Sequence, residues 1–357
     1  MIITDLSGQW EVLLDESKAD VLPDKYPDRI NLPDSTSNAG LGRLNPEIEY
    51  GCLTDLHKFE GFAWFRRTIE ITPEMAERNI TLFLERTRKT RVYLDGKPLE
   101  DCSSLCAPHR CSLTGTAAGK HELVIRVDNT DYPTGGGHLT SRDTQTNWNG
   151  IVGRIELQAY HAYAQYVYAF AGDDLRSLHV RAEIVGENAG TAEIRVYDDE
   201  REYGSAAVEF TAGKPVECDI ALPEDVPLWS DDSPDLVTLE VAVGGDIRQV
   251  QAGIRRLSHD DRTLLVNGRQ AFLRGKHDGM VFPATGYMPT DANSWLEFFG
   301  KLAEYGINHV RYHTCCPPDE AFTAADRLGI YLQPELPFWG TIPDEFGAEH
   351  ELSLIHI

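Results

Sequence analysis

The most constraining feature of this chain is a change of pattern after Leu257, where short apolar segments begin to alternate with amphipathic helices. The segments 272–275, 307–312 and 330–332 have the length and apolar content of short strands. A strand-helix-strand-helix-strand run with short connections requires a parallel sheet with right-handed crossovers. We therefore expect the first part of a (β/α)8 TIM barrel.

Both helical segments carry start and stop signals. Asp291 and Asp319 are expected to cap the helices at their beginnings, and Gly306 and Gly329 to end them. The apolar spacing predicts that these residues face inward: Trp295, Phe298, Phe299 and Leu302 in the first helix, and Phe322, Ala325 and Leu328 in the second.

The residues before this region predict two β-sandwich domains, because short alternating strands are separated by turn residues. We expect a jelly-roll domain at 1–161, with its clearest strands at 63–71, 81–84, 91–94 and 122–127. An immunoglobulin-like sandwich is expected at 162–257, with strands at 177–184, 192–197, 206–210 and 236–243.

The barrel part is expected at 258–351, whereas a complete barrel needs about 250 residues. Three of eight strands cannot close a barrel. We therefore expect either that part of the chain is missing or that this part is unstable alone. The last residues, 352–357, are the translation of a nucleotide sequence that resembles a transposon end used in sequencing libraries. We interpret them as a sequencing-adapter artefact, with an ordinary apolar tail as the alternative.

The composition of the chain limits the kinds of partner that it can bind. The formal net charge of -24 is spread along the chain and no basic stripe is present, which argues against nucleic acid as a partner. The chain contains no apolar run of about 18 residues, so the sequence predicts no membrane span.

The seven cysteines form an odd number without a CxxC pair, which favours reduced thiols. We therefore expect a cytoplasmic location, or a periplasmic or secreted one if a signal peptide was lost. Homo-oligomerisation is possible in either case.

Polar residues follow the predicted barrel strands, at the end where barrel enzymes place their functional groups. His277 and Asp278 could hydrogen-bond sugar hydroxyls, and Arg311 could hold a carboxylate. His313, at the end of the next strand, is a further candidate for substrate binding. The other candidates for substrate binding are Glu335, in a stiff proline-flanked loop, and Trp339, whose ring could stack on a pyranose or pack in the core.

The same rim also contains possible metal ligands, but their pattern argues against a metal site. Cys315 and Cys316, with His313 and His277, offer zinc ligands, but adjacent cysteines seldom chelate one ion and no HExxH motif is present. We expect neither a metal nor another cofactor.

A long polar loop precedes the strand that begins near Arg154. It contains the run 135–138, Gly-Gly-Gly-His, and long glycine-rich loops in compact domains are often functional. Asp143 and Asn147 are the candidates to reach the barrel mouth; a solvated loop with Asx turns is the alternative.

Segments along the chain resemble sequences of glycoside hydrolase family 2, the group of β-galactosidases, β-glucuronidases and β-mannosidases. The resemblance covers residues 6 to 345 and is carried by these segments: 6–10, 61–67, 150–153, 228–230, 252–255, 266–278, 308–311, 328–330 and 334–335. Two departures stand out. The stretch 312–317 is one residue longer than the family's pattern, and Pro337 stands where magnesium-binding members have a histidine.

The resemblance implies an exo-acting β-glycosidase with a retaining mechanism and two catalytic glutamates, one acting as acid/base and one as nucleophile. Neither position falls within these 357 residues, so a C-terminally truncated, inactive fragment is expected. The implied partner is an oligosaccharide or β-glycoside. A non-catalytic carbohydrate-binding protein and, further off, a metallohydrolase remain alternatives.

Overall fold

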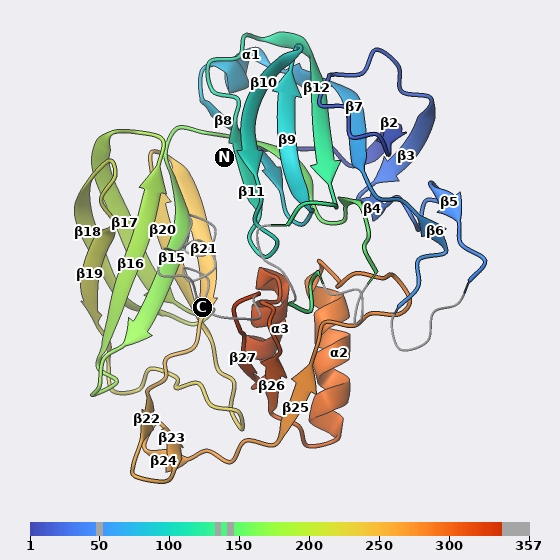
Figure 1. Cartoon of the computed structure of the whole chain (residues 1–357). Helices are drawn as coiled ribbons and strands as arrows, with labels where there is room; N and C mark the ends of the chain where they lie inside the picture. Colours follow the sequence, from blue (N-terminus) through green and yellow to red (C-terminus); the bar gives the residue numbers. More distant parts are fainter. Residues whose placement is uncertain (48–52, 133–136, 141–145, 338–357) are drawn as a thin grey trace.

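The computed structural model describes residues 1–357 except 48–52, 133–136, 141–145 and 338–357. Figure 1 shows two regions of β-sheet, blue to green and green to yellow, and an orange to red region of mixed helix and strand. No helix in the described part of the chain is long and apolar enough to cross a membrane. Trp339 and the segment 352–357 lie outside the described residues.

The first region is a sandwich of two antiparallel sheets, which we call the first sandwich. One sheet has the order β10-β9-β12-β7-β2-β3, with bounds Lys97–Cys102, Lys89–Leu94, Gly119–Asp128, Phe62–Ile71, Gly8–Asp15 and Asp28–Leu32. The other has the order β1-β14-β8-β11, with bounds Ile2–Asp5, Ile155–Tyr160, Asn79–Leu84 and His109–Ser112. The remaining elements are β4 (Asp34–Ser35) with β13 (Gly150–Ile151), β5 (Arg43–Leu44) with β6 (His57–Lys58), and α1 (Pro73–Ala76).

Alternation of apolar and polar residues explains why these strands form a sandwich. Trp10 and Val12 on β2 and Leu82 and Leu84 on β8 are buried and belong to one core between the sheets. The four strands predicted most clearly, at 63–71, 81–84, 91–94 and 122–127, lie in β7, β8, β9 and β12, so these predictions are confirmed.

The second sandwich has the same construction with fewer strands. Its sheets have the orders β15-β16-β19 and β18-β17-β20-β21, with bounds Tyr163–Ala171, Ser177–Val185, Val216–Ala221, Glu202–Thr211, Ala189–Tyr197, Val237–Val243 and Asp246–Ala252. Its core is separate and mostly aliphatic, with Val180, Ile194 and Leu239 fully buried. A small antiparallel sheet follows, formed by β22 (Leu257–His259), β23 (Leu264–Val266) and β24 (Arg269–Gln270).

The chain ends in a region that we call the α/β unit. Its strands β25 (Gly275–Asp278), β26 (His309–Tyr312) and β27 (Tyr331–Gln333) form a parallel sheet, with α2 (Ala292–Glu304) and α3 (Asp319–Leu328) between them in the sequence. The predicted parallel sheet is therefore confirmed. A closed (β/α)8 barrel remains a prediction.

The structure corrects the first predicted strand of this unit. The strand begins at Gly275 rather than Phe272, and Phe272 is 69% exposed. The segment before Gly275 is instead held by the side chain of Asn308, whose Nδ2 donates to the Phe272 carbonyl and whose Oδ1 accepts from the Arg274 amide. A side-chain clamp thus takes the place of strand pairing at 272–274.

The helices follow the predicted pattern with two corrections. Asp291 caps α2 by accepting a hydrogen bond from the Ser294 amide, as predicted. Asp319, however, is the first residue of α3 and Pro318 occupies the cap position. The buried face of α3 consists of Ala321, Ala324 and Ala325, while Phe322 and Leu328 are only half-buried; small alanines allow α3 to lie close to its neighbours.

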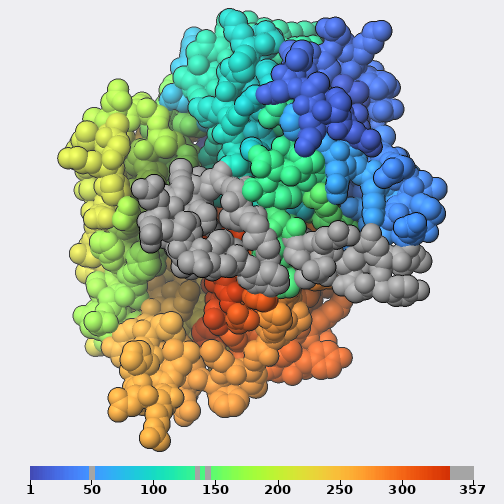
Figure 2. Space-filling model, in the orientation of Figure 1, coloured from blue at the N-terminus to red at the C-terminus, as the bar shows by residue number. Residues whose placement is uncertain are grey.

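The three regions pack against one another (Figure 2). Leu105 and Leu139 of the first sandwich lie in the core of the α/β unit, together with Trp295 and Phe299 of α2. From the second sandwich, Trp229 is buried and its indole Nε1 donates to the Asp326 carbonyl of α3 at 2.7 Å. The ends of the parallel strands are consequently held against the first sandwich.

Candidate functional site

Parallel pairing brings two predicted histidines together at the carboxyl ends of the strands. His277 lies opposite Arg311 in the register of β25 and β26, and His313 follows β26 directly. The His313 amide donates to the Asp278 carbonyl at 2.8 Å, which continues the pairing past the strand end. The ring centroids of His277 and His313 are 5.1 Å apart.

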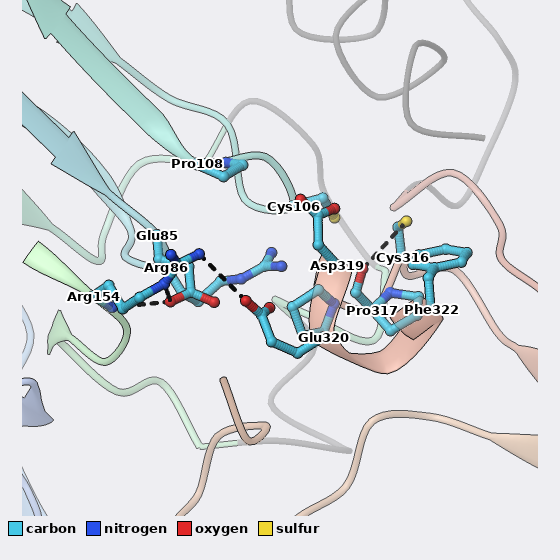
Figure 3. A pocket seen from close by; sticks show the side chains of 11 residues that line it. Glu85, Arg86, Cys106, Pro108, Arg154, Cys316, Pro317, Asp319, Glu320 and Phe322 are labelled. Carbon is cyan, nitrogen blue, oxygen red and sulfur yellow. Dashed lines mark hydrogen bonds and ion pairs between the residues drawn. The ribbon is translucent and has the colours of Figure 1, made fainter. Parts of the chain in front are cut away.

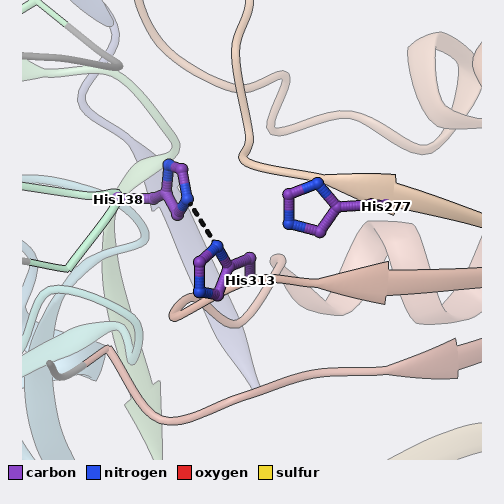
Figure 4. A group of neighbouring side chains, drawn as sticks. All are labelled: His138, His277 and His313. Carbon is purple, nitrogen blue, oxygen red and sulfur yellow. Dashed lines mark hydrogen bonds between the residues drawn. The ribbon is translucent and has the colours of Figure 1, made fainter.

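A third histidine, His138, reaches this position from the first sandwich (Figure 4). Its Nε2 lies 2.8 Å from His313 Nδ1, and its backbone amide donates to Thr314 Oγ1 at 2.8 Å. Gly279 makes the approach possible, because a Cβ at this residue would lie 2.9 Å from His138 Nδ1. The site therefore lies between two regions of the chain.

Two carboxylates fix the turns around the histidines. Glu335 forms an ion pair with Arg311, and its second oxygen accepts a hydrogen bond from the Thr314 amide at 2.9 Å. Asp278 forms an ion pair with Lys276 and accepts from the Met280 amide at 2.7 Å. These contacts hold the strand ends in a defined geometry.

The backbone at this rim is strained at two non-glycine residues. Thr314 has a φ of 52° and Met280 a φ of 58°, in the left-handed region that ordinary side chains disfavour. Each is buried and each donates its amide to one of the carboxylates described above. Backbone strain held in place by such contacts is characteristic of functional sites.

The three imidazoles form a compact group of nitrogen ligands. One nitrogen from each of His138, His277 and His313 can be chosen so that all three lie within 4.8 Å of one another. Burial, followed by the proximity of His313 and His277, lowers the pKa of His138 below the ordinary value for histidine. A neutral ring at this residue can donate or accept a hydrogen bond, and it can ligate a metal ion.

The sequence also predicts Asn147, Asp143 and Trp339 as site residues. The side chain of Asn147 is engaged within the first sandwich, where it accepts from the Tyr132 hydroxyl and donates to the Asn129 carbonyl. Asp143 and Trp339 lie outside the described residues. The sequence predicts a role for the loop that contains His138, but it does not identify His138 itself. The sequence feature that marks this residue is a lone histidine after three glycines.

The cysteines are not part of the histidine group. Cys315 and Cys316 are buried, and Cys315 belongs to the core of the α/β unit. Burial raises the pKa of both thiols well above the ordinary value, which disfavours the thiolate form that binds metal ions. The six described cysteines are free thiols.

A second polar cluster joins the first sandwich to α3 (Figure 3). Arg154 lies between two carboxylates, with its Nε 3.0 Å from Glu85 Oε2 and its Nη2 3.3 Å from Glu320 Oε1. Burial, followed by the proximity of Glu85, raises the pKa of Glu320 to about 8. This cluster lines a small pocket at the boundary of the two regions.

The chain is similar to two curated proteins over part of its length. It is 28% identical over 137 residues to the β-galactosidase large subunit of Latilactobacillus sakei, which is 36% of this chain and 21% of that protein. It is 25% identical over 171 residues to a β-galactosidase of Lactococcus lactis, which is 46% of this chain and 16% of that protein. No protein-family model matches the chain.

Solved structures match almost the whole chain. A β-glucuronidase of Faecalibacterium prausnitzii has a TM-score of 0.72 at 20% identity, covering 94% of this chain and 60% of its own. A glycosyl hydrolase family 2 member from Bacteroides cellulosilyticus has a TM-score of 0.70 at 17% identity, covering 94% and 46%. The chain thus spans about 60% or less of the proteins that it matches.

Proposed function

We propose that this chain, which resembles glycoside hydrolase family 2 and shares the fold of a solved member of that family over 94% of its length, is part of an exo-acting β-glycosidase that hydrolyses O-glycosyl bonds. The observation that carries the proposal is the meeting of His138, His277 and His313 at the carboxyl ends of parallel strands, where barrel enzymes bind their substrates. Imidazoles in this position suit the hydroxyl groups of a sugar, because each ring offers one donor and one acceptor.

The carboxylate of Glu335 has a supporting role in this proposal. It holds Arg311 on one side and the Thr314 amide on the other, so it positions the turn that carries His313. The acid/base and nucleophile glutamates of the retaining mechanism are assigned to residues outside these 357 positions. They would lie about 5 to 5.5 Å apart, as retaining hydrolysis requires.

The charges at the rim favour a neutral sugar over a uronic acid. Of the described residues at the strand ends, the cations Lys276 and Arg311 each form an ion pair with a carboxylate, Asp278 and Glu335 respectively. A uronate carboxylate would need a cation that is not already neutralised in this way. We therefore propose a neutral β-hexoside, such as a β-galactoside, as the substrate.

The binding test uses the chain itself. We expect methyl β-galactoside to broaden the imidazole proton NMR signals of His138, His277 and His313, and methyl β-glucuronide to have a smaller effect. No change with any neutral β-glycoside would contradict the proposed site.

The activity test uses the protein encoded by the uninterrupted gene, with a panel of aryl β-glycosides. His277→Ala should lower turnover by about 10-fold or more, because a hydrogen bond to the substrate is lost, while stability changes little because His277 is exposed. His259→Ala, an exposed histidine on β22, is the matched control. Inactivity on every substrate would refute the assignment.

A further inference from the structure

We propose that His138, His277 and His313 form a binding site for a divalent transition-metal ion of the zinc type, which ties the first sandwich to the α/β unit. The three ligands come from three separate segments of the chain and converge on one point (Figure 4). This inference departs from the sequence-based expectation of no metal, and it goes beyond the proposed function, which assigns these side chains to hydrogen bonding with sugar. With an ion bound to one nitrogen of each ring, a sugar hydroxyl would instead bind at the open coordination position.

The distances bracket the spacing that zinc needs. Zinc binds histidine nitrogens at about 2.0–2.1 Å in a tetrahedral arrangement, so two ligand nitrogens lie about 3.3–3.4 Å apart. His138 Nε2 and His313 Nδ1 are 2.8 Å apart. One nitrogen of each of the three rings can be chosen so that all three lie within 4.8 Å of one another. Side-chain rotations that open the first pair by about 0.5 Å, and close the widest by at most about 1.5 Å, produce the required geometry.

The surroundings already hold the ligands in place. The His138 amide is bound to Thr314 Oγ1, and the His313 amide is bound to the Asp278 carbonyl. Fixed ligands lower the entropic cost of binding an ion. Because His138 is buried at 8% exposure and Gly279 lies against its ring, only a small reorientation is open to this side chain.

The ligand type selects the class of metal. Three imidazoles suit zinc, nickel, cobalt and copper, whereas magnesium and calcium prefer oxygen ligands. Three protein ligands also leave a coordination position for water or a substrate hydroxyl. The buried thiols of Cys315 and Cys316 lie in or beside the core and do not take part.

The binding experiment uses the 357-residue chain, freed of any affinity tag and treated with a chelator. Titration with zinc chloride against a chromophoric chelator should give one site per chain, and cobalt chloride should give the visible absorption bands of a tetrahedral site. Magnesium chloride should give no binding. Failure of both zinc and cobalt to bind stoichiometrically would overturn the proposal.

Three variants locate the site. His138→Gln, His277→Gln and His313→Gln should each weaken zinc binding by at least about 10-fold, since each removes a direct ligand. His259→Gln, which changes an exposed histidine on β22, should leave the affinity unchanged. Equal affinity in the wild-type chain and in the triple variant would assign the zinc to other surface groups and refute the proposal.

Thermal unfolding separates a metal ligand from a merely structural histidine. Zinc should raise the Tm of the wild-type chain and of His259→Gln, because the ion binds the folded state, and at the same zinc concentration it should raise the Tm of His138→Gln clearly less. An equal zinc-induced rise in the wild-type and His138→Gln chains would show that the His138–His313 contact is only a hydrogen bond. Sugar binding measured with chelator present remains a separate test of the proposed function.

Discussion

Replacing Glu320 with glutamine should remove one contribution to the pH dependence of stability between pH 5.5 and 7.5. Glu320 lies at the start of α3 beside Glu85 and Arg154, and its pKa is raised to about 8 by burial and by the neighbouring carboxylate. Its ordinary value is 4.5. The folded chain therefore retains a proton that the unfolded chain releases in this interval.

Proton linkage gives the sign and the size of this change in stability with pH. Because the folded-state pKa is the higher one, the stability contributed by this proton is complete below about pH 4.5 and is lost as the pH rises toward about 8. One proton contributes a slope of about 1.4 kcal/mol per pH unit, so the wild-type chain should lose about 2 to 3 kcal/mol relative to Glu320→Gln between pH 5.5 and 7.5.

Urea unfolding at pH 5.5, 6.5 and 7.5, followed through the change in tryptophan fluorescence as buried indoles become exposed, measures this difference. Contributions from histidines occur in both proteins and cancel. Glu304→Gln, an equal charge change at an exposed residue of α2, is the control and should give a constant difference. If the difference between wild type and Glu320→Gln were also constant with pH, the raised pKa of Glu320 would be refuted.

Three further perturbations test other contacts. Gly279→Ala places a Cβ 2.9 Å from the ring of His138, so it should displace that side chain and alter its imidazole NMR signals while the far-UV circular dichroism is retained. Trp229→Ala should lower the free energy of unfolding by about 3–5 kcal/mol, as measured by urea unfolding, because a buried indole between the second sandwich and α3 is lost. Glu335→Gln should lower it by only about 1 kcal/mol or less in the same assay, since its partner Arg311 is 41% exposed and the amide still accepts from the backbone.

Much of the fold was predictable because the pattern of apolar residues differs between its parts. Short segments rich in β-branched and aromatic residues, bounded by turn residues, predicted strands such as β7 and β12. The spacing of Trp295 and Phe299 predicted the inner face of α2. The strand start at Gly275 was not predictable, because the Asn308 clamp depends on a residue more than thirty positions away.

The candidate site was predictable only where the chain itself orders the residues. Parallel strands place His277 and His313 at one edge, so the strand pattern was sufficient for them. The third histidine, His138, comes from a different region, and local sequence gives no measure of how two regions pack. The role of Glu320 was hidden for the same reason, because its neighbour Glu85 belongs to the first sandwich.

The core of the α/β unit includes residues of the first sandwich, so its folding depends on the order in which the chain is synthesised. Leu105 and Leu139 complete that core, so the parallel strands lack part of their apolar surroundings until the first sandwich exists. Synthesis from the amino terminus delivers this surface before the ribosome releases β25, and domains generally fold in that order. A circular permutant that is translated with β25 first would expose Trp295 and Phe299 to solvent for longer, and it should partition more into aggregates.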